Sequence, residues 1–128
     1  MTMSMNQIHT KVSKHLLKQG KRSEDGTGVA GNNCVYRSSD GLMCAVGCLI
    51  PDAQYYSGLE GQDVNKGMVL DTLRDVIGTR FVNRTKKIDL LERLQFIHDQ
   101  VPVENWAIKL EGLKKDYKGD FQILGEGL

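Results

Sequence analysis

Residues 34–50 have the sequence Cys-Val-Tyr-Arg-Ser-Ser-Asp-Gly-Leu-Met-Cys-Ala-Val-Gly-Cys-Leu-Ile, and this stretch decides the predicted fold. Two apolar runs flank an Asp-Gly pair, a strong short-range signal for a β-hairpin because glycine adopts the positive φ angles of tight hairpin turns. We place the first arm at 34–37, the turn at 38–41 and the second arm at 42–49. The second arm is apolar at nearly every position, as expected of a strand buried on both faces. Periodicity alone also allows a short buried helix there.

Helical periodicity covers most of the remaining chain. Residues 4–19 carry apolar side chains at three- and four-residue spacing, Ser4 and Gln7 match a capping box, and Gly20 is a plausible end. Further helices are expected at 67–77, at 86–100 with Thr85 as N-cap, and at 103–117, with a short helix after Pro51. The expected apolar helix faces comprise Met5, Ile8, Val12, Leu16, Val69, Leu73, Val76, Ile77, Ile88, Leu91, Leu94, Ile97, Trp106, Leu110 and Leu113.

A lone hairpin is marginally stable, so it has to pack against the helices. The predicted fold class is therefore α+β, with four to five helices around one small antiparallel hairpin. With 128 residues, the chain is most simply a single domain, 1–128. We expect residues 1–3 and 120–128 to fray and the glycine-rich stretch 20–33 to form a long loop.

The hydrophobic fraction of 40% and the charged fraction of 26% are ordinary for a globular protein. No apolar run approaches the roughly 18–20 residues that a membrane span needs. The first residues lack the apolar core of a secretory signal. We therefore expect a cytoplasmic protein with no membrane partner.

The three cysteines, Cys34, Cys44 and Cys48, are an odd number, which excludes a closed disulfide framework. Their spacing lacks the paired knuckles of structural zinc sites, so we expect inert buried thiols and neither metal nor cofactor. The alternative is a small enzyme in which Cys44 or Cys48 is the nucleophile and His98 is the base, oriented by Asp99. It requires the fold to bring the last part of helix 86–100 to the hairpin.

Basic residues are concentrated at the start of the chain. The first 23 residues hold five bases and no acid, although the net charge of the whole chain is only +1. These bases form a stripe that could follow a phosphate backbone, which makes weak nucleic-acid binding a second alternative. The stripe comprises Lys11, Lys14, Lys18, Lys21 and Arg22.

Four residues near the predicted hairpin suit a ligand-binding rim: Tyr36, Arg37, Tyr55 and Tyr56. A guanidinium beside an aromatic ring suits phosphate contact and base stacking. Aromatic residues near turns also make good anchors for a protein partner. The rim is therefore compatible with a host protein or a small, nucleotide-like ligand.

Several segments resemble a group of small proteins encoded by tailed bacteriophages and prophages, from about residue 5 to 117. They are residues 14–23, the segment Cys-Ala-Val-Gly-Cys-Leu-Ile-Pro-Asp at 44–52, the Leu-Glu-Gly at 59–61, residues 94–99 and the Pro102 to Trp106 spacing. The resemblance implies a phage-type origin and the bacterial cytoplasm as compartment. It carries over no functional residue.

Together these observations lead us to expect a small, non-enzymatic accessory protein of phage type. Its expected role is to bind a host protein or a small ligand and thereby counteract host defence. The two alternatives, a cysteine enzyme and a weak nucleic-acid binder, stay open at this point.

Overall fold

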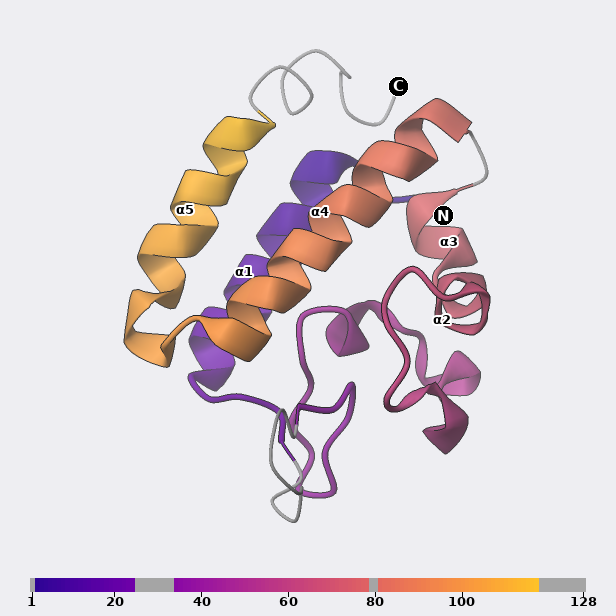
Figure 1. Ribbon diagram of the computed structural model, residues 1–128, viewed down its shortest axis with the longest axis horizontal. Coiled ribbons are helices and arrows are strands. Elements are labelled where there is room, and N and C mark those ends of the chain that lie inside the picture. Colours follow the sequence, from indigo (N-terminus) through magenta and orange to yellow (C-terminus); the bar gives the residue numbers. More distant parts are fainter. Residues whose placement is uncertain (1, 25–33, 79–80, 118–128) are drawn as a thin grey trace.

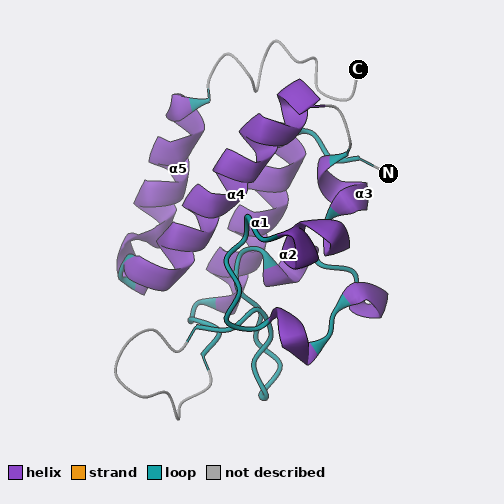
Figure 2. Ribbon diagram, turned by 45° about the vertical axis from the view of Figure 1, so that its right-hand side comes forward, coloured by secondary structure: helices purple, strands orange, loops and turns teal. Residues whose placement is uncertain are grey.

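The computed structural model describes residues 2–24, 34–78 and 81–117, with the side chains of 81–83 left out (Figure 1). These residues form five α-helices: α1 (Met5–Gln19), α2 (Gly67–Thr72), α3 (Arg74–Ile77), α4 (Phe81–Gln100) and α5 (Trp106–Asp116). Single turns of 3-10 helix lie at Gly47–Leu49, Asp52–Gln54, Ser57–Leu59 and Val103–Asn105. The long helices α1, α4 and α5 pack against one another, and α3 packs against α4. Figure 2 shows the loops between α1 and α2 gathered at one end of these helices.

The predicted α+β class is wrong, because the described residues contain no β-strand. The chain does turn at the Asp-Gly pair: Ser38 N–H donates to the Leu42 carbonyl at 2.9 Å, and Gly41 has φ +90°. However, the two arms pair only at one isolated bridge, between Arg37 and Met43. Beyond it, the second arm coils into the 3-10 turn at Gly47–Leu49.

The arms do not form a ladder because side chains from outside the segment bind much of their backbone. Gln19 accepts from Met43 N–H at 3.0 Å and donates to the Met43 carbonyl at 2.9 Å. His15 binds the same carbonyl at 2.8 Å, and Gln95 accepts from Val46 N–H at 3.0 Å. Because buried backbone groups need partners of some kind, these contacts replace the inter-strand hydrogen bonds of a hairpin.

Helix α1 matches the sequence prediction closely. Ser4 Oγ accepts from Gln7 N–H at 3.0 Å, and Gln7 Oε1 accepts from Ser4 N–H at 2.8 Å, which completes the capping box. Gly20 ends the helix with φ +69°, in the left-handed region that favours glycine. The expected apolar face is fully buried: Met5, Ile8, Val12 and Leu16.

The middle helices depart from their predicted bounds. The predicted helix 67–77 is interrupted at Leu73, where φ is −103° and ψ is 9°. The Thr72 hydroxyl next to the break donates to the Val69 carbonyl at 2.6 Å, a local bond of the kind that bends helices. Helix α4 begins at residue 81 rather than 86, so Thr85 lies inside the helix and is not its N-cap.

The last helix and the chain ends differ in smaller ways. A 3-10 turn at Val103–Asn105 precedes α5, which ends at Asp116. Residue 1, residues 25–33 of the predicted long loop and residues 118–128 lie outside the described part. Met3, which was expected to fray, donates its N–H to the Val76 carbonyl at 2.8 Å. Among the described residues, no helix is both long and apolar enough to span a bilayer.

Gly47 permits the close approach of two loops. A Cβ at this position would lie 2.0 Å from the Tyr36 carbonyl oxygen, which belongs to the backbone and cannot swing away. We therefore expect Gly47→Ala to lower the free energy of unfolding by about 3 kcal/mol, as overpacking of a buried site does. Urea unfolding followed by circular dichroism measures this loss.

Gly112 provides the matched control, because a Cβ there would meet nothing within 4 Å. It lies inside α5, where alanine is the better helix former. Gly112→Ala should raise the free energy of unfolding by roughly 0.5–1 kcal/mol. Equal effects of the two substitutions would contradict the packing at Gly47.

His9 gives the fold a defined pH dependence. Its Nε2 donates to the Leu110 carbonyl at 2.8 Å, and burial lowers its pKa below the usual value of 6.5, against the opposing effect of that hydrogen bond. The unfolded chain therefore binds more protons than the folded one as pH falls below about 6.5. We expect the free energy of unfolding to decrease from pH 7 to pH 5, by less than about 1.4 kcal/mol per pH unit for this group.

The His9→Gln variant keeps an N–H donor for the Leu110 carbonyl but does not titrate. Its stability should fall less steeply than that of the original protein between pH 7 and pH 5. Thermal unfolding at a series of pH values provides the comparison, and parallel curves for the two proteins would refute the assignment to His9.

Candidate functional site

His98 lies fully buried near the end of α4, stacked on the Trp106 ring with centroids 5.6 Å apart. Its Nε2 accepts from Ser23 N–H at 2.9 Å, and its Nδ1 lies 2.7 Å from Asp99 Oδ1. A backbone N–H only donates, so Nε2 has no proton and Nδ1 is the donor to Asp99. His98 is therefore a neutral imidazole with both nitrogens engaged.

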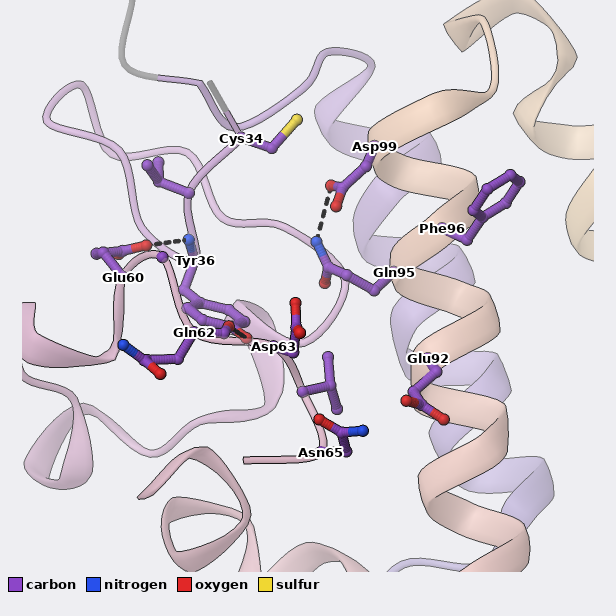
Figure 3. A pocket seen from close by; sticks show the side chains of 13 residues that line it. Cys34, Tyr36, Glu60, Gln62, Asp63, Asn65, Glu92, Gln95, Phe96 and Asp99 are labelled. Carbon is purple, nitrogen blue, oxygen red and sulfur yellow. Dashed lines mark hydrogen bonds between the residues drawn. The ribbon is translucent and has the colours of Figure 1, made fainter. Parts of the chain in front are cut away.

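Hydrogen bonds extend from His98 to two neighbouring loops. Gln95 donates to Asp99 Oδ1 at 2.9 Å and, through its carbonyl oxygen, holds Val46 N–H (Figure 3). On the other side, Ser23 Oγ donates to the Leu42 carbonyl at 3.1 Å. The end of α4 thus fixes the chain on both sides of the undescribed segment 25–33.

Arg22, predicted as a phosphate contact, binds two backbone carbonyls of the protein. Its Nε donates to the His98 carbonyl at 2.9 Å and its Nη2 to the Val101 carbonyl at 2.6 Å. A guanidinium is favourable here because the carbonyls at the end of a helix lack intrahelical partners and carry partial negative charge. The other members of the predicted stripe are exposed: Lys11, Lys14, Lys18 and Lys21.

The cysteines are poorly suited to nucleophilic chemistry. Burial raises the pKa of Cys48 to about 12, although nearby Lys11 opposes the shift. Burial also raises the pKa of Cys44, which has no exposed surface. The hydrogen-bond partners of His98 are Ser23 and Asp99, so neither thiol uses it as a base.

Cys34, which was not a candidate nucleophile, lies closest to this network. Burial raises the pKa of its thiol to about 12, and the charge of the Asp99 carboxylate adds to the shift. A cysteine nucleophile needs a base with a free nitrogen beside it. Both nitrogens of His98 are engaged, by Ser23 and by Asp99, so His98 does not take the proton of this thiol.

The same three groups offer atoms of the kinds that bind metal ions. Cys34 Sγ, a ring nitrogen of His98 and a carboxylate oxygen of Asp99 lie within 4.8 Å of one another. A metal needs a free nitrogen lone pair, yet Nε2 accepts from Ser23 and Nδ1 carries the proton. If that proton moved to Nε2, the N–H of His98 and the backbone N–H of Ser23 would point at each other, and both groups are donors. The hydrogen bonds therefore favour a structural role for this cluster.

Three of the four predicted rim residues converge on one carboxylate, Glu60. Its oxygens accept from Tyr36 N–H at 2.8 Å, from Arg37 N–H at 3.1 Å and from the Tyr55 hydroxyl at 2.6 Å. These bonds use a charged acceptor, which makes them stronger than bonds between neutral groups. They fix the first arm of the predicted hairpin to residues 55–60.

Most polar ends of these rim residues are bonded within the protein, although the buried Arg37 Nε makes no hydrogen bond to any residue that the structure describes. Arg37 donates to the Ile50 carbonyl at 2.5 Å, forms an ion pair with Asp52 at 2.8 Å and lies over the Tyr55 ring at 4.9 Å. Tyr36 is buried, and its hydroxyl donates to the Gln62 carbonyl at 2.5 Å. Tyr56 is the exposed member, with 47% of its surface accessible. The structure therefore assigns Tyr36, Arg37 and Tyr55 mainly to packing.

A cavity of about 420 Å³ opens beside this cluster, between residues 34–36, residues 60–65 and α4 (Figure 3). Among the residues that the structure describes, no lysine or arginine lines it and four carboxylates do: Glu60, Asp63, Glu92 and Asp99. Glu60 and Asp99 are engaged as described. Asp63 and Glu92 are exposed, on opposite walls, and neither forms an ion pair with any residue that the structure describes.

Sequence reasoning missed Asp63 and Glu92. One signal was present, since Glu92, Phe96 and Asp99 recur at the spacing of a single helix face. No sequence pattern connects this face with the 60–65 segment, because the contact depends on the tertiary fold.

Phe96 separates this cavity from a second depression between α4 and α5, of about 390 Å³. Its side chain is 60% exposed and points away from the acidic cavity in Figure 3. Apolar residues of α4, α5 and the segment between them line the floor of the second depression: Phe96, Ile97, Val101 and Leu113. Three charged residues also line it: Arg93, Lys109 and Asp116. An exposed aromatic ring between an acidic and an apolar hollow is typical of a contact surface.

No protein-family model, curated protein or solved structure matches the chain, so its function has to be inferred from this geometry.

The raised pKa of Cys34 predicts slow alkylation by iodoacetamide. Near pH 8, Cys34 should react at least about a hundredfold more slowly than an unhindered thiol of pKa near 8.5. Asp99→Asn removes the negative charge but keeps an oxygen that accepts from His98 and Gln95, so it should accelerate Cys34 severalfold. Peptide mapping by mass spectrometry gives the rate at each cysteine.

The control is the same reaction in denaturant, where burial no longer raises the pKa of any of the three thiols. Rapid, selective labelling of one cysteine in the folded protein at pH 7 would overturn this interpretation and restore the cysteine-enzyme alternative.

Proposed function

We propose that the protein acts by binding, without catalysis, and that the acidic cavity beside α4 receives a positively charged group of a partner protein. The main support is the pair Asp63 and Glu92, two exposed carboxylates on opposite walls without a cation among the lining residues. A guanidinium or ammonium group placed between them would gain two ion pairs and contact the Gln95 amide.

The charge of the cavity favours a cation over the nucleotide considered from the sequence. Carboxylates repel phosphate oxygens, whereas Arg37, the base expected to attract them, is held by Asp52 and the Ile50 carbonyl. Catalysis receives little support, because burial raises the pKa values of the cysteines and His98 has no free nitrogen.

The nature of the partner depends on the resemblance to tailed-phage proteins. On that basis, the proposed partner is a host protein of the bacterial cytoplasm, and the proposed effect of binding is to weaken a host defence. The aromatic side chains of Tyr56 and Phe96 are the exposed anchors available for such an interface.

Titration with N-acetyl-argininamide tests the cavity directly. We expect about millimolar binding, because exposed ion pairs contribute only roughly 0.2–1 kcal/mol each. The amide signals of residues 60–65 and 92–99 should shift in two-dimensional NMR spectra. N-acetyl-citrullinamide has nearly the same shape without the charge, and it should cause no such shifts.

The double variant Asp63→Asn/Glu92→Gln should weaken this binding at least severalfold. Asp75→Asn/Glu104→Gln changes the net charge equally at exposed positions that do not line the cavity, and it should bind as the original protein does. Equal binding of both amides, or equal losses in both variants, would reject the proposed cation site.

A further inference from the structure

The exposed face of α1 carries positive charge, which suits the acidic cavity, and an apolar residue, which suits the exposed Phe96. Lys11, Lys14 and Lys18 lie on this face at three- and four-residue spacing, and α1 contains no acidic residue. Leu17 lies among them with 49% of its surface exposed. The face is therefore basic with an apolar contact residue, the chemistry expected of a partner segment.

The outer stripe of α4 has the complementary pattern. Glu92 is exposed on this stripe, four residues before the exposed Phe96. On α1 the exposed Lys18 is next to the exposed Leu17, so each helix presents a charged and an apolar side chain close together. Antiparallel docking of the two helices would in addition oppose their dipoles favourably.

A molecule cannot place this face of α1 in its own cavity. The opposite, apolar face of α1 is buried in the core, where α1 packs against α4 and α5. The lysine face consequently points away from its own α4 and is available only to another molecule.

We propose that the exposed face of α1 docks along α4 of a second copy of this chain, with its lysines at the acidic cavity and Leu17 against Phe96. The inference rests on the proposed function, since it uses the same cation-binding cavity. Each contact joins α1 of one molecule to α4 of another. Successive contacts generate rings or open chains, and a reciprocal pair of contacts generates a twofold dimer.

Sedimentation equilibrium of the full chain tests this assembly. At low ionic strength, the weight-average mass should rise above the monomer mass with increasing concentration. The association should weaken at least about tenfold between roughly 10 mM and 1 M salt, because exposed charges are screened. A protein that stays monomeric at about millimolar concentration and low salt would overturn the inference.

Two complementary variants make the test specific. Lys14→Gln/Lys18→Gln removes the docking face and leaves the cavity, while Asp63→Asn/Glu92→Gln removes the cavity charge and leaves the docking face. Each should remain monomeric alone, and their equimolar mixture should form a one-to-one dimer and nothing larger. Lys114→Gln/Lys115→Gln, two exposed lysines of α5 outside both hollows, is the matched control and should associate normally.

The outcomes separate the two proposals. If the cavity binds N-acetyl-argininamide and the protein stays monomeric, the self-association is rejected and the proposed function survives. If the protein neither binds N-acetyl-argininamide nor self-associates, both the proposed function and the self-association are rejected. Association that persists in Lys14→Gln/Lys18→Gln also overturns the inference, because another surface must then be responsible.

Discussion

The pair of hydrogen bonds on buried His98 is the constraint on which the arrangement of this molecule depends. One nitrogen accepts from Ser23 N–H and the other donates to Asp99, so the imidazole is held neutral between a loop and its own helix. Losing either partner would leave a buried polar group unsatisfied, at a cost of about 1–3 kcal/mol. Arg22 strengthens the same junction by binding two carbonyls at the end of α4.

The candidate binding surface is a consequence of two such junctions. The His98 network positions one wall of the acidic cavity through Gln95 and Asp99, and Glu60 positions the opposite wall through the backbone of Tyr36 and Arg37. Because the half-buried carboxylates of Glu60 and Asp99 are occupied in holding these walls, the exposed ones of Asp63 and Glu92 are left for a partner. Stability and binding therefore use different carboxylates of one cavity.

Local signals in the sequence predicted local structure well. The capping box at Ser4 and the apolar face of α1 needed only neighbouring residues, and both were predicted correctly. The hairpin failed because residues distant in sequence, Gln19 and Gln95, bind the backbone that a second strand would have paired. The contacts of the predicted rim residues could not be foreseen for the same reason, since nothing local indicates that Glu60 engages Tyr36, Arg37 and Tyr55. Tertiary contacts override strand propensity in such cases.

The capture of backbone groups in residues 34–46 has a consequence for solubility. The two arms of this stretch are largely apolar on either side of the polar turn, and apolar segments recruit identical chains into cross-β aggregates when their N–H and C=O groups are free. Glu60, Gln19 and Gln95 occupy several of these groups at Tyr36, Arg37, Met43 and Val46. The polar side chains that bind this backbone thus also protect it from cross-β pairing with other chains.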